Sequence, residues 1–245
     1  MCGLAAIFGS SQTKKQDTEN MISVIAHRGP DHQGFSHKQD ISMGSCRLSI
    51  FDITDKGNMP MSDKTGRFTI VYNGEIYNFK ELRKSLNNYG YKFNTESDTE
   101  VILSGYDYFG KKIFSLLNGM WSIVIFDIKS NNLIFSRDIF GEKPLYFSCI
   151  KKKNFVFGSE IKYLEKILSQ KFNPNFEKIK TTFYQGYKSI FHEEKTFCNE
   201  VSSFPKNTVS KFDLKKMKMI TSNFFKFEKN KKLSDSLKKI SEKVK

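Results

Sequence analysis

The sequence predicts an α+β fold in which antiparallel sheets pack together. β-rich runs follow one another with short polar turns between them, and segments with helical spacing are few. Such turns are too short for the crossover helices that parallel strands need. The pattern is clearest in WSIVIFDI, NLIFSRDIF and PLYFSCI, which KSNN and GEK separate and NFVFGS follows. Strands in runs with a minority of helices are typical of α+β proteins.

Each expected element rests on a local pattern. GLAAIFG is a continuous apolar run, which predicts a strand covered on both faces. The other expected strands are ISMGSCRLSIFD, RFTIVYNGEIYN, the four runs named above, and two edge strands within residues 199–220. The expected helices are a short one in 20–34 broken at Gly29-Pro30, one in 80–90 that Gly90 ends, and three in 96–110, 161–171 and 231–245.

Two of these helices carry further signals. Ser97 or Asp98 suits the N-cap of the helix in 96–110, and Glu100 stands three residues after Ser97, as a capping box requires. The terminal stretch is amphipathic, because its apolar residues recur at spacings of three and four: Leu233, Leu237, Ile240 and Val244. A helix with such a stripe usually packs on another surface.

Charge is distributed unevenly along the chain. The formal net charge is +14, yet residues 1–150 hold 17 basic and 16 acidic residues, whereas 151–245 hold 23 lysines, no arginine and 10 acidic residues. Nucleic-acid readers use arginine forks and recognisable motifs, so this lysine-rich part predicts a solvated surface and no nucleic-acid partner.

Membrane and metal classes are also disfavoured. No apolar stretch approaches the roughly eighteen residues of a membrane span. The four cysteines lie far apart with no CxxC pair, which argues against a zinc site or a disulfide framework and favours the reducing cytoplasm. They are Cys2, Cys46, Cys149 and Cys198.

Cys2 is the first candidate for chemistry. No basic leader precedes its apolar run, as a secretory signal would need, and Gly3 stands one place too late for acylation. A buried structural cysteine is the commoner case. If Met1 is removed, however, Cys2 carries a free α-amine with an ordinary pKa of about 7.7–8.0, which is a general base beside the thiol. N-terminal nucleophiles combine base and nucleophile in this way.

Other residues have the chemistry to assist such a nucleophile. The Asn73 side-chain amide and the Gly74 backbone N–H are suitable oxyanion donors, although Asn-Gly is also a common hairpin turn. Arg47, at the end of a strand, offers the planar fork that a carboxylate needs, or makes a surface salt bridge. Asp98 can accept an α-ammonium group or cap its helix, and Glu75 can share either binding role.

Eight blocks, in order, resemble the glutaminase domain of class II glutamine amidotransferases, in particular of glutamine-hydrolysing asparagine synthetases. They are MCGLAAIFG, HRGPDHQG, RLSIFD, VYNGEIYNFKEL, SDTEVIL, LNGMWSIVIFD, RDIFGEKPLYF and FGSEIK. The match is densest over residues 2–165 and looser to about 227. The resemblance implies a four-layer αββα sandwich of antiparallel sheets, of the N-terminal nucleophile hydrolase type.

The resemblance also implies a role for each residue. Cys2 is the nucleophile with its α-amine as base, Asn73 and Gly74 form the oxyanion hole, and Glu75 lies in the same binding segment. Arg47 binds the α-carboxylate of glutamine and Asp98 its α-ammonium. Backbone groups line the pocket along Leu48, Ser49, Ile50 and Phe51. A loop over the pocket is shaped by His27, Arg28 and Asp31, which receive no chemical role.

The resemblance is limited to the glutaminase part. No SGGxDS-type loop for the pyrophosphate of ATP occurs, so ATP-dependent activation of an acceptor is not expected of this sequence. The resemblance implies glutamine hydrolysis alone, which needs no cofactor or metal. ATP and Mg²⁺ are implied only for an absent synthetase domain, towards which residues 228–245 resemble the connector. The expected partners are L-glutamine, that domain or a separate partner chain, and a second copy of this chain. Glutamine hydrolysis for another acceptor, or a non-catalytic remnant that binds a partner, are the alternatives.

Overall fold

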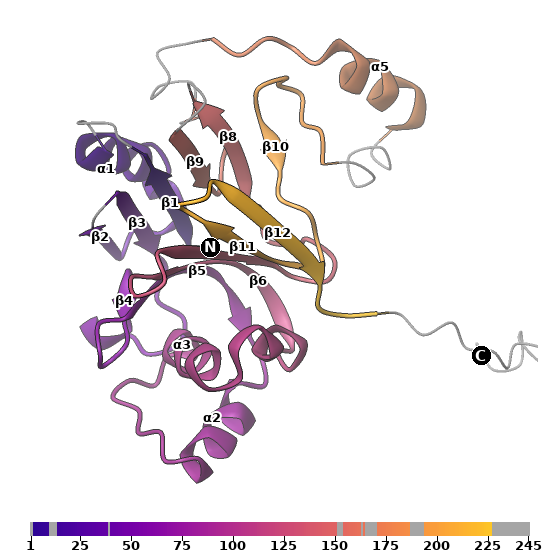
Figure 1. The fold of residues 1–245 in the computed structure, drawn as a ribbon. Coiled ribbons are helices and arrows are strands. Elements are labelled where there is room, and N and C mark those ends of the chain that lie inside the picture. The colour runs from indigo at the N-terminus through magenta and orange to yellow at the C-terminus, as the bar shows by residue number, and fades with distance from the viewer. Residues whose placement is uncertain are drawn as a thin grey trace, which may run out of the picture.

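The computed structural model describes residues 2–9, 14–38, 40–150, 154–162, 164, 171–186 and 194–226. They form two six-stranded sheets that pack face to face, and all named strand pairs are antiparallel. Helices cover the outer face of each sheet (Figure 1). The expected α+β fold and its αββα layering are therefore confirmed.

The first sheet has the strand order β10-β8-β9-β1-β3-β2. Its strands are β1 (Gly3–Phe8), β2 (His32–Lys38), β3 (Ile41–Arg47), β8 (Tyr146–Ile150), β9 (Asn154–Gly158) and β10 (Ser202–Ser203). The second sheet has the order β12-β11-β7-β6-β5-β4. Its strands are β4 (Met61–Ser62), β5 (Phe68–Ile76), β6 (Gly119–Asp127), β7 (Asn132–Arg137), β11 (Thr208–Asp213) and β12 (Lys218–Asn223).

The helices divide between the two outer faces. α1 packs on β1 and β3, and α3 packs on β5 and on α2. Figure 1 shows α1 on the far side of the first sheet, and α2 and α3 below the second. The helical bounds are α1 (Lys14–Val24), α2 (Phe79–Asn88), α3 (Asp98–Phe109), α5 (Phe176–Gln185), and the 3-10 turns η1 (Ala26–Arg28), η2 (Asp55–Gly57) and η3 (Gly110–Ser115).

Three apolar cores separate the four layers. Alternate residues of a strand point to opposite faces, so one buried strand contributes to two cores. In β1, Ala5 and Ile7 pack against α1, whereas Leu4 and Phe8 pack between the sheets. In β5, Tyr72 contributes to the core under α2 and α3. This double coverage explains why β1 is apolar at every position.

Cys2 reaches the second sheet because of the strand register. Gly3 of β1 lies opposite Cys46 of β3, so the residue before β1 lies beside the residues that end and follow β3. β1 and β3 both pack on β5. The start of β1, the end of β3 and the last third of β5 therefore meet at one end of the sandwich.

Several expected elements were wrong in detail. The Asn73-Gly74 hairpin alternative is excluded, because both residues lie inside β5, opposite Ser122 and Trp121 of β6. The helical stretch in 20–34 stops before Gly29 as expected, but α1 begins at Lys14, and β2 follows where no strand was expected.

The capping box is only half formed. Ser97 caps α3 and accepts from the Thr99 N–H at 3.1 Å. Glu100 does not turn back to Ser97, since its carboxylate accepts from the N–H groups of Asn94 and Thr95 at 2.8–3.0 Å. Ser97 N–H donates instead to the Thr95 hydroxyl at 3.1 Å.

The β7–β8 connection differs from the expected hairpin. β6 pairs with β7 and β8 pairs with β9, as expected, but β7 and β8 belong to different sheets. The GEK segment thus carries the chain from one sheet to the other. The two edge strands expected within residues 199–220 are present as β10 and β12, each at an edge of its sheet, while β11 between them in sequence is an inner strand.

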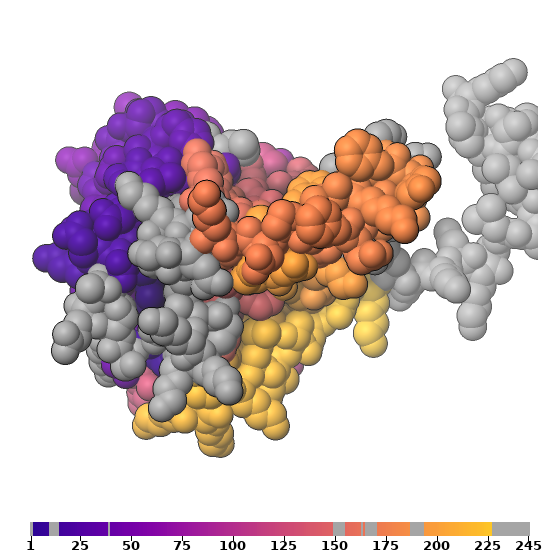
Figure 2. Space-filling view, turned by 90° about the horizontal axis from the view of Figure 1, so that it is seen from above, coloured from indigo at the N-terminus to yellow at the C-terminus, as the bar shows by residue number. Residues whose placement is uncertain are grey.

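The segment that contains α5 lies at the surface of the molecule. Figure 2 shows the orange segment that contains α5 on the outer surface, at one side of the molecule. None of the helices in the described part of the chain is long and apolar enough to cross a membrane. The expected helix in 161–171 falls mostly, and that in 231–245 entirely, outside the described residues.

Candidate active site

The Cys2 thiol is held by the chain just after β3. The Leu48 N–H donates to Cys2 Sγ at 3.4 Å, and the thiol faces the Leu48 carbonyl oxygen at 3.6 Å. Burial raises the pKa of the Cys2 thiol, with the Leu48 hydrogen bond as a smaller opposing effect. The neutral thiol is a poor nucleophile, so this sulfur needs an adjacent base to react near pH 7.

Arg28 fixes the main chain of Cys2. Its Nε donates to the Cys2 carbonyl oxygen at 3.0 Å, and its Nη1 donates to Glu160 Oε1 at 3.1 Å. The Glu160 carboxylate also contacts His27 Nε2 and Lys162 Nζ, each at 3.0 Å. The expectation that His27 and Arg28 shape the surroundings of the site, without doing chemistry, agrees with these contacts.

Asn73 provides an unused hydrogen-bond donor. The residue is 1% exposed, and its Nδ2 is fully buried with no hydrogen-bond partner among the described residues. An orphaned buried donor costs about 1–3 kcal/mol, so it calls for an explanation. The next residue must be glycine, because a Cβ on Gly74 would lie 2.2 Å from the Met120 carbonyl oxygen of β6.

Arg47 ends β3 and organises the loop that follows. It is 4% exposed, and its charge has no carboxylate partner among the described residues. The two terminal nitrogens donate to four neutral acceptors: the carbonyl oxygens of Thr54, Phe51 and Asp52, and Asn58 Oδ1. Gly57 permits this packing, since a Cβ there would lie 2.4 Å from Arg47 Nη2. These contacts leave the Nε donor unused among the described residues, so a substrate carboxylate can bind there or exchange with some of these acceptors.

Asp98 opens α3 and is 5% exposed. Its Oδ2 accepts from the Tyr72 hydroxyl at 2.9 Å and from the Ile76 N–H at 3.0 Å. Burial raises the pKa of Asp98, and these two hydrogen bonds partly oppose the effect. The cap itself is Ser97, so Asp98 is not needed for that structural task.

The HRGPD loop supports the segment after β3. Asp31 Oδ2 accepts from the Ser49 N–H at 2.7 Å, and the Asp31 N–H donates to the Arg47 carbonyl oxygen at 3.0 Å. Ser49 therefore faces the supporting loop, and it is absent from the pocket lining. The expected pocket role of Ser49 does not agree with this position.

One pocket collects the other predicted residues. Its lining includes Cys2, Arg47, Leu48, Ile50, Phe51, Asn73, Gly74, Glu75 and Asp98. Six further residues, which the sequence did not single out for this pocket, also line it: Gly57, Met59, Tyr72, Ser97, Thr99 and Lys143. The cavity volume is about 40 Å³, close to the ~30 Å³ share of one water molecule. The loop after β3 forms one wall of this cavity through Leu48, Ile50 and Phe51.

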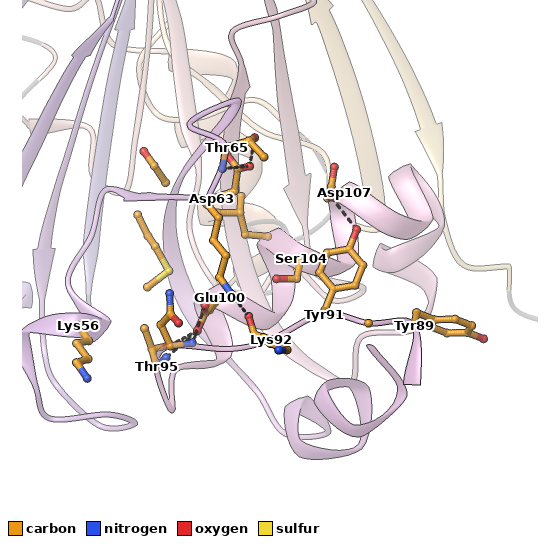
Figure 3. A pocket seen from close by; sticks show the side chains of 16 residues that line it. Lys56, Asp63, Thr65, Tyr89, Tyr91, Lys92, Thr95, Glu100, Ser104 and Asp107 are labelled. Atoms are coloured by element: carbon orange, nitrogen blue, oxygen red, sulfur yellow. Dashed lines mark hydrogen bonds between the residues drawn. The ribbon is translucent and has the colours of Figure 1, made fainter. Parts of the chain in front are cut away.

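A larger cavity of about 650 Å³ lies beside α3 (Figure 3). It holds no cysteine, and its acidic groups already serve local structure. Asp107 accepts from the Tyr91 hydroxyl at 2.7 Å, and Glu100 accepts from the Thr95 N–H and hydroxyl at 2.8 Å. The chemistry of the smaller pocket makes it the better candidate for an active site.

Comparison with known proteins shows the family of the chain. The family described as glutamine amidotransferase domain matches residues 1–225. The chain belongs to this family. As a class II glutamine amidotransferase domain it is similar to asparagine synthetase [glutamine-hydrolyzing] 1 of Bacillus subtilis, with 40% identity over 169 residues, 67% of this chain and 26% of that protein.

Two further relatives extend the similarity. A putative asparagine synthetase [glutamine-hydrolyzing] 2 of Methanocaldococcus jannaschii is 36% identical over 76% of this chain and 40% of its own length. Amidase chry2 of Gibberella zeae is 30% identical over 78% of this chain and 31% of its own length. The chain thus spans well under half the length of these relatives.

The fold is shared with a solved amidotransferase. Glutamine phosphoribosylpyrophosphate amidotransferase from B. subtilis, complexed with ADP and GMP, superimposes with a TM-score of 0.68 at 17% identity. The match covers 92% of this chain and 50% of that chain. At this identity the likeness confirms the fold of the amidotransferase domain.

Proposed function

We propose that this chain hydrolyses the side-chain amide of L-glutamine to glutamate and ammonia, through a thioester on Cys2. The observation that carries the proposal is one pocket that holds both the Cys2 thiol and the unpaired Asn73 Nδ2. A nucleophile beside a preorganised, unused donor suits acyl transfer, in which negative charge develops on a carbonyl oxygen.

The reaction starts after removal of Met1, which leaves Cys2 with a free α-amine. This amine takes the thiol proton, and the sulfur attacks the side-chain carbonyl carbon of glutamine. Asn73 Nδ2 and the Gly74 N–H stabilise the tetrahedral oxyanion. The protonated amine then gives its proton to the departing nitrogen, and the carbon–nitrogen bond breaks to release ammonia. Water then attacks the thioester and gives a proton to the amine. The amine passes this proton to the sulfur as the carbon–sulfur bond breaks, which releases glutamate.

Substrate binding uses two of the buried charged residues of the pocket, Arg47 and Asp98. Arg47 receives the α-carboxylate, in exchange for some of its carbonyl acceptors, as the loop over residues 50–58 opens. Asp98 receives the α-ammonium, while Tyr72 and Ile76 keep its Oδ2 in place. Glu75 and the backbone of Leu48, Ile50 and Phe51 complete the pocket wall. The glutaminase reaction needs no cofactor or metal.

The ammonia goes to an acceptor outside this chain. Relatives named glutamine-hydrolysing asparagine synthetases favour aspartate, activated with ATP and Mg²⁺ by a synthetase domain or partner chain. A relative named as an amidase supports a different acceptor as the second candidate. We place the reaction in the cytoplasm, which the wide spacing of the four cysteines and the absence of a CxxC pair support. Residues 2–227 form the glutaminase domain, and 228–245 connect it to its partner.

The proposal is tested by measuring glutamate release from glutamine in an enzyme-coupled assay. The protein used has Met1 removed. We expect turnover in the wild type and in Cys198→Ala, a matched thiol variant outside the pocket. Cys2→Ala, which also permits removal of Met1, should have none. Equal turnover in wild type and Cys2→Ala, or none in either, would reject the proposal.

A further inference from the structure

We propose that Lys143 is a further catalytic residue of this site, whose ammonium group stabilises the negative charge that develops on the reacting carbonyl oxygen. The inference rests on the proposed glutamine hydrolysis. It adds a charged group to the two neutral donors, Asn73 Nδ2 and the Gly74 N–H.

Lys143 is buried at the pocket although it is charged. It is 5% exposed and lines the same cavity as Cys2, Asn73 and Gly74. Lysine is almost never buried without a partner, because removal of its charge from water is costly. Within the described part of the chain, its ammonium group makes no hydrogen bond or ion pair. The side chain as a whole is buried, but its ammonium is not among the fully buried groups without a partner, so it faces the pocket space and is available to an anion.

The backbone holds Lys143 on the oxyanion side of the pocket. The Lys143 N–H donates to Asp138 Oδ2 at 3.1 Å, and its carbonyl oxygen accepts from Arg137 Nε at 2.8 Å. The same Asp138 oxygen accepts from the Trp121 N–H at 3.2 Å. Trp121 lies directly opposite Gly74 in the β5–β6 register. The GEK crossing is therefore tied to β6, the strand that pairs with the one carrying the oxyanion donors.

Two charged residues of the pocket match the two charged groups of glutamine, so the second cation, Lys143, is available for another role. Arg47 suits the permanent α-carboxylate of glutamine, and Asp98 suits its α-ammonium. The remaining negative charge is transient, on the oxygen of the tetrahedral intermediate. Lys143 is the other cation of the pocket lining, and its backbone is tied to β6 at the position opposite Gly74, which suits a role towards this oxygen. A charged donor that acts mainly on the intermediate raises kcat more than it lowers KM.

The test compares Lys143→Met, which keeps the length of the side chain without its charge, with Lys143→Arg, which keeps the charge. Lys143→Gln is a second neutral variant in case methionine disturbs the fold, and Lys129→Met is the control on an exposed lysine. We expect kcat to fall about 10²-fold in both neutral variants, as for the loss of one oxyanion donor. KM should stay within about twofold and Lys143→Arg should recover part of kcat.

A second measurement isolates the tetrahedral state. The aldehyde analogue of glutamine adds the Cys2 S–H across its C=O bond and gives a tetrahedral thiohemiacetal. We expect Lys143→Met to bind this aldehyde at least tenfold more weakly than the wild type, with Lys129→Met unchanged. Wild-type kcat and aldehyde affinity in folded neutral variants would overturn the role of Lys143, as would a change in KM alone. A wild type that neither hydrolyses glutamine nor binds the aldehyde would overturn the proposed function as well.

Discussion

Replacement of Asn73 by alanine should separate activity from stability. Among the residues that the structure describes, the buried Asn73 Nδ2 has no hydrogen-bond partner, so the folded protein already bears its desolvation cost of about 1–3 kcal/mol. Alanine removes this cost but leaves a small void, which offsets part of the gain. We therefore expect the melting temperature to stay the same or rise by up to about 4 °C, since 1 kcal/mol corresponds to about 2–4 °C in a chain of this size.

Activity should respond in the opposite direction. Loss of one oxyanion donor typically lowers kcat about 10²–10³-fold, or about 2.7–4 kcal/mol of transition-state stabilisation. The assays are glutamate release and thermal unfolding followed by circular dichroism, with Asn88→Ala, an exposed asparagine in α2, as the control. Refutation would be a melting temperature lowered by more than about 5 °C together with an unchanged kcat, because Asn73 would then stabilise the fold instead of waiting for substrate.

Three further substitutions test binding and electrostatics. Asp98→Asn keeps an oxygen acceptor but loses the charge, so KM for glutamine should rise about 10–100-fold in steady-state assays; an unchanged KM would exclude the ammonium contact. Gly57→Ala places a Cβ 2.4 Å from Arg47 Nη2, so it should also raise KM, with kcat less affected, and equal KM values would show that Arg47 does not bind substrate. Burial raises the pKa of Cys46 from 9.0 to about 11, so the folded state keeps a proton that the unfolded chain loses in this window. The free energy of unfolding, measured with urea, should therefore fall by about 2 kcal/mol from pH 9 to pH 11, and this component should be absent in Cys46→Ala; identical pH profiles would contradict the burial effect.

The sequence could predict the parts of the fold that depend on local patterns. The continuous apolar run of β1 predicts a strand between two covered faces, and Ala5 and Leu4 indeed belong to different cores. The helix caps and the antiparallel pairs of neighbouring runs follow from short-range chemistry. Cys2, Arg47, Asn73 and Asp98 each have a structural alternative, so they could be selected only together, through the ordered motif blocks that resemble the family.

The missed features depend on tertiary contacts. A polar turn such as GEK looks like a hairpin, and no local signal distinguishes it from a crossing between sheets. Nothing in the sequence therefore indicates that Lys143 is buried in a pocket, although this one lysine contributes much of the charge of that pocket. Ser49 lies between two pocket residues in sequence, but its N–H is held by Asp31, which is distant along the chain.

The contacts of the loop after β3 also depend on the tertiary structure. Arg47 looks free to bind a carboxylate when only the sequence is considered. In the folded chain its guanidinium is occupied by the carbonyl oxygens of residues 51–54 and by Asn58. The contacts of this arginine thus couple substrate binding to opening of the loop, which spacing along the chain does not reveal.

The most direct test of the central claim is intact mass spectrometry before and after exposure to 6-diazo-5-oxonorleucine, a glutamine-mimicking diazo-ketone. This reagent needs only one turnover, so it reports on the nucleophile even where steady-state rates are low. We predict a mass without Met1 and a single adduct that is absent in Cys2→Ala. Processed protein that takes no adduct, or an adduct that persists in Cys2→Ala, would contradict the assignment of Cys2 as a glutamine-directed nucleophile.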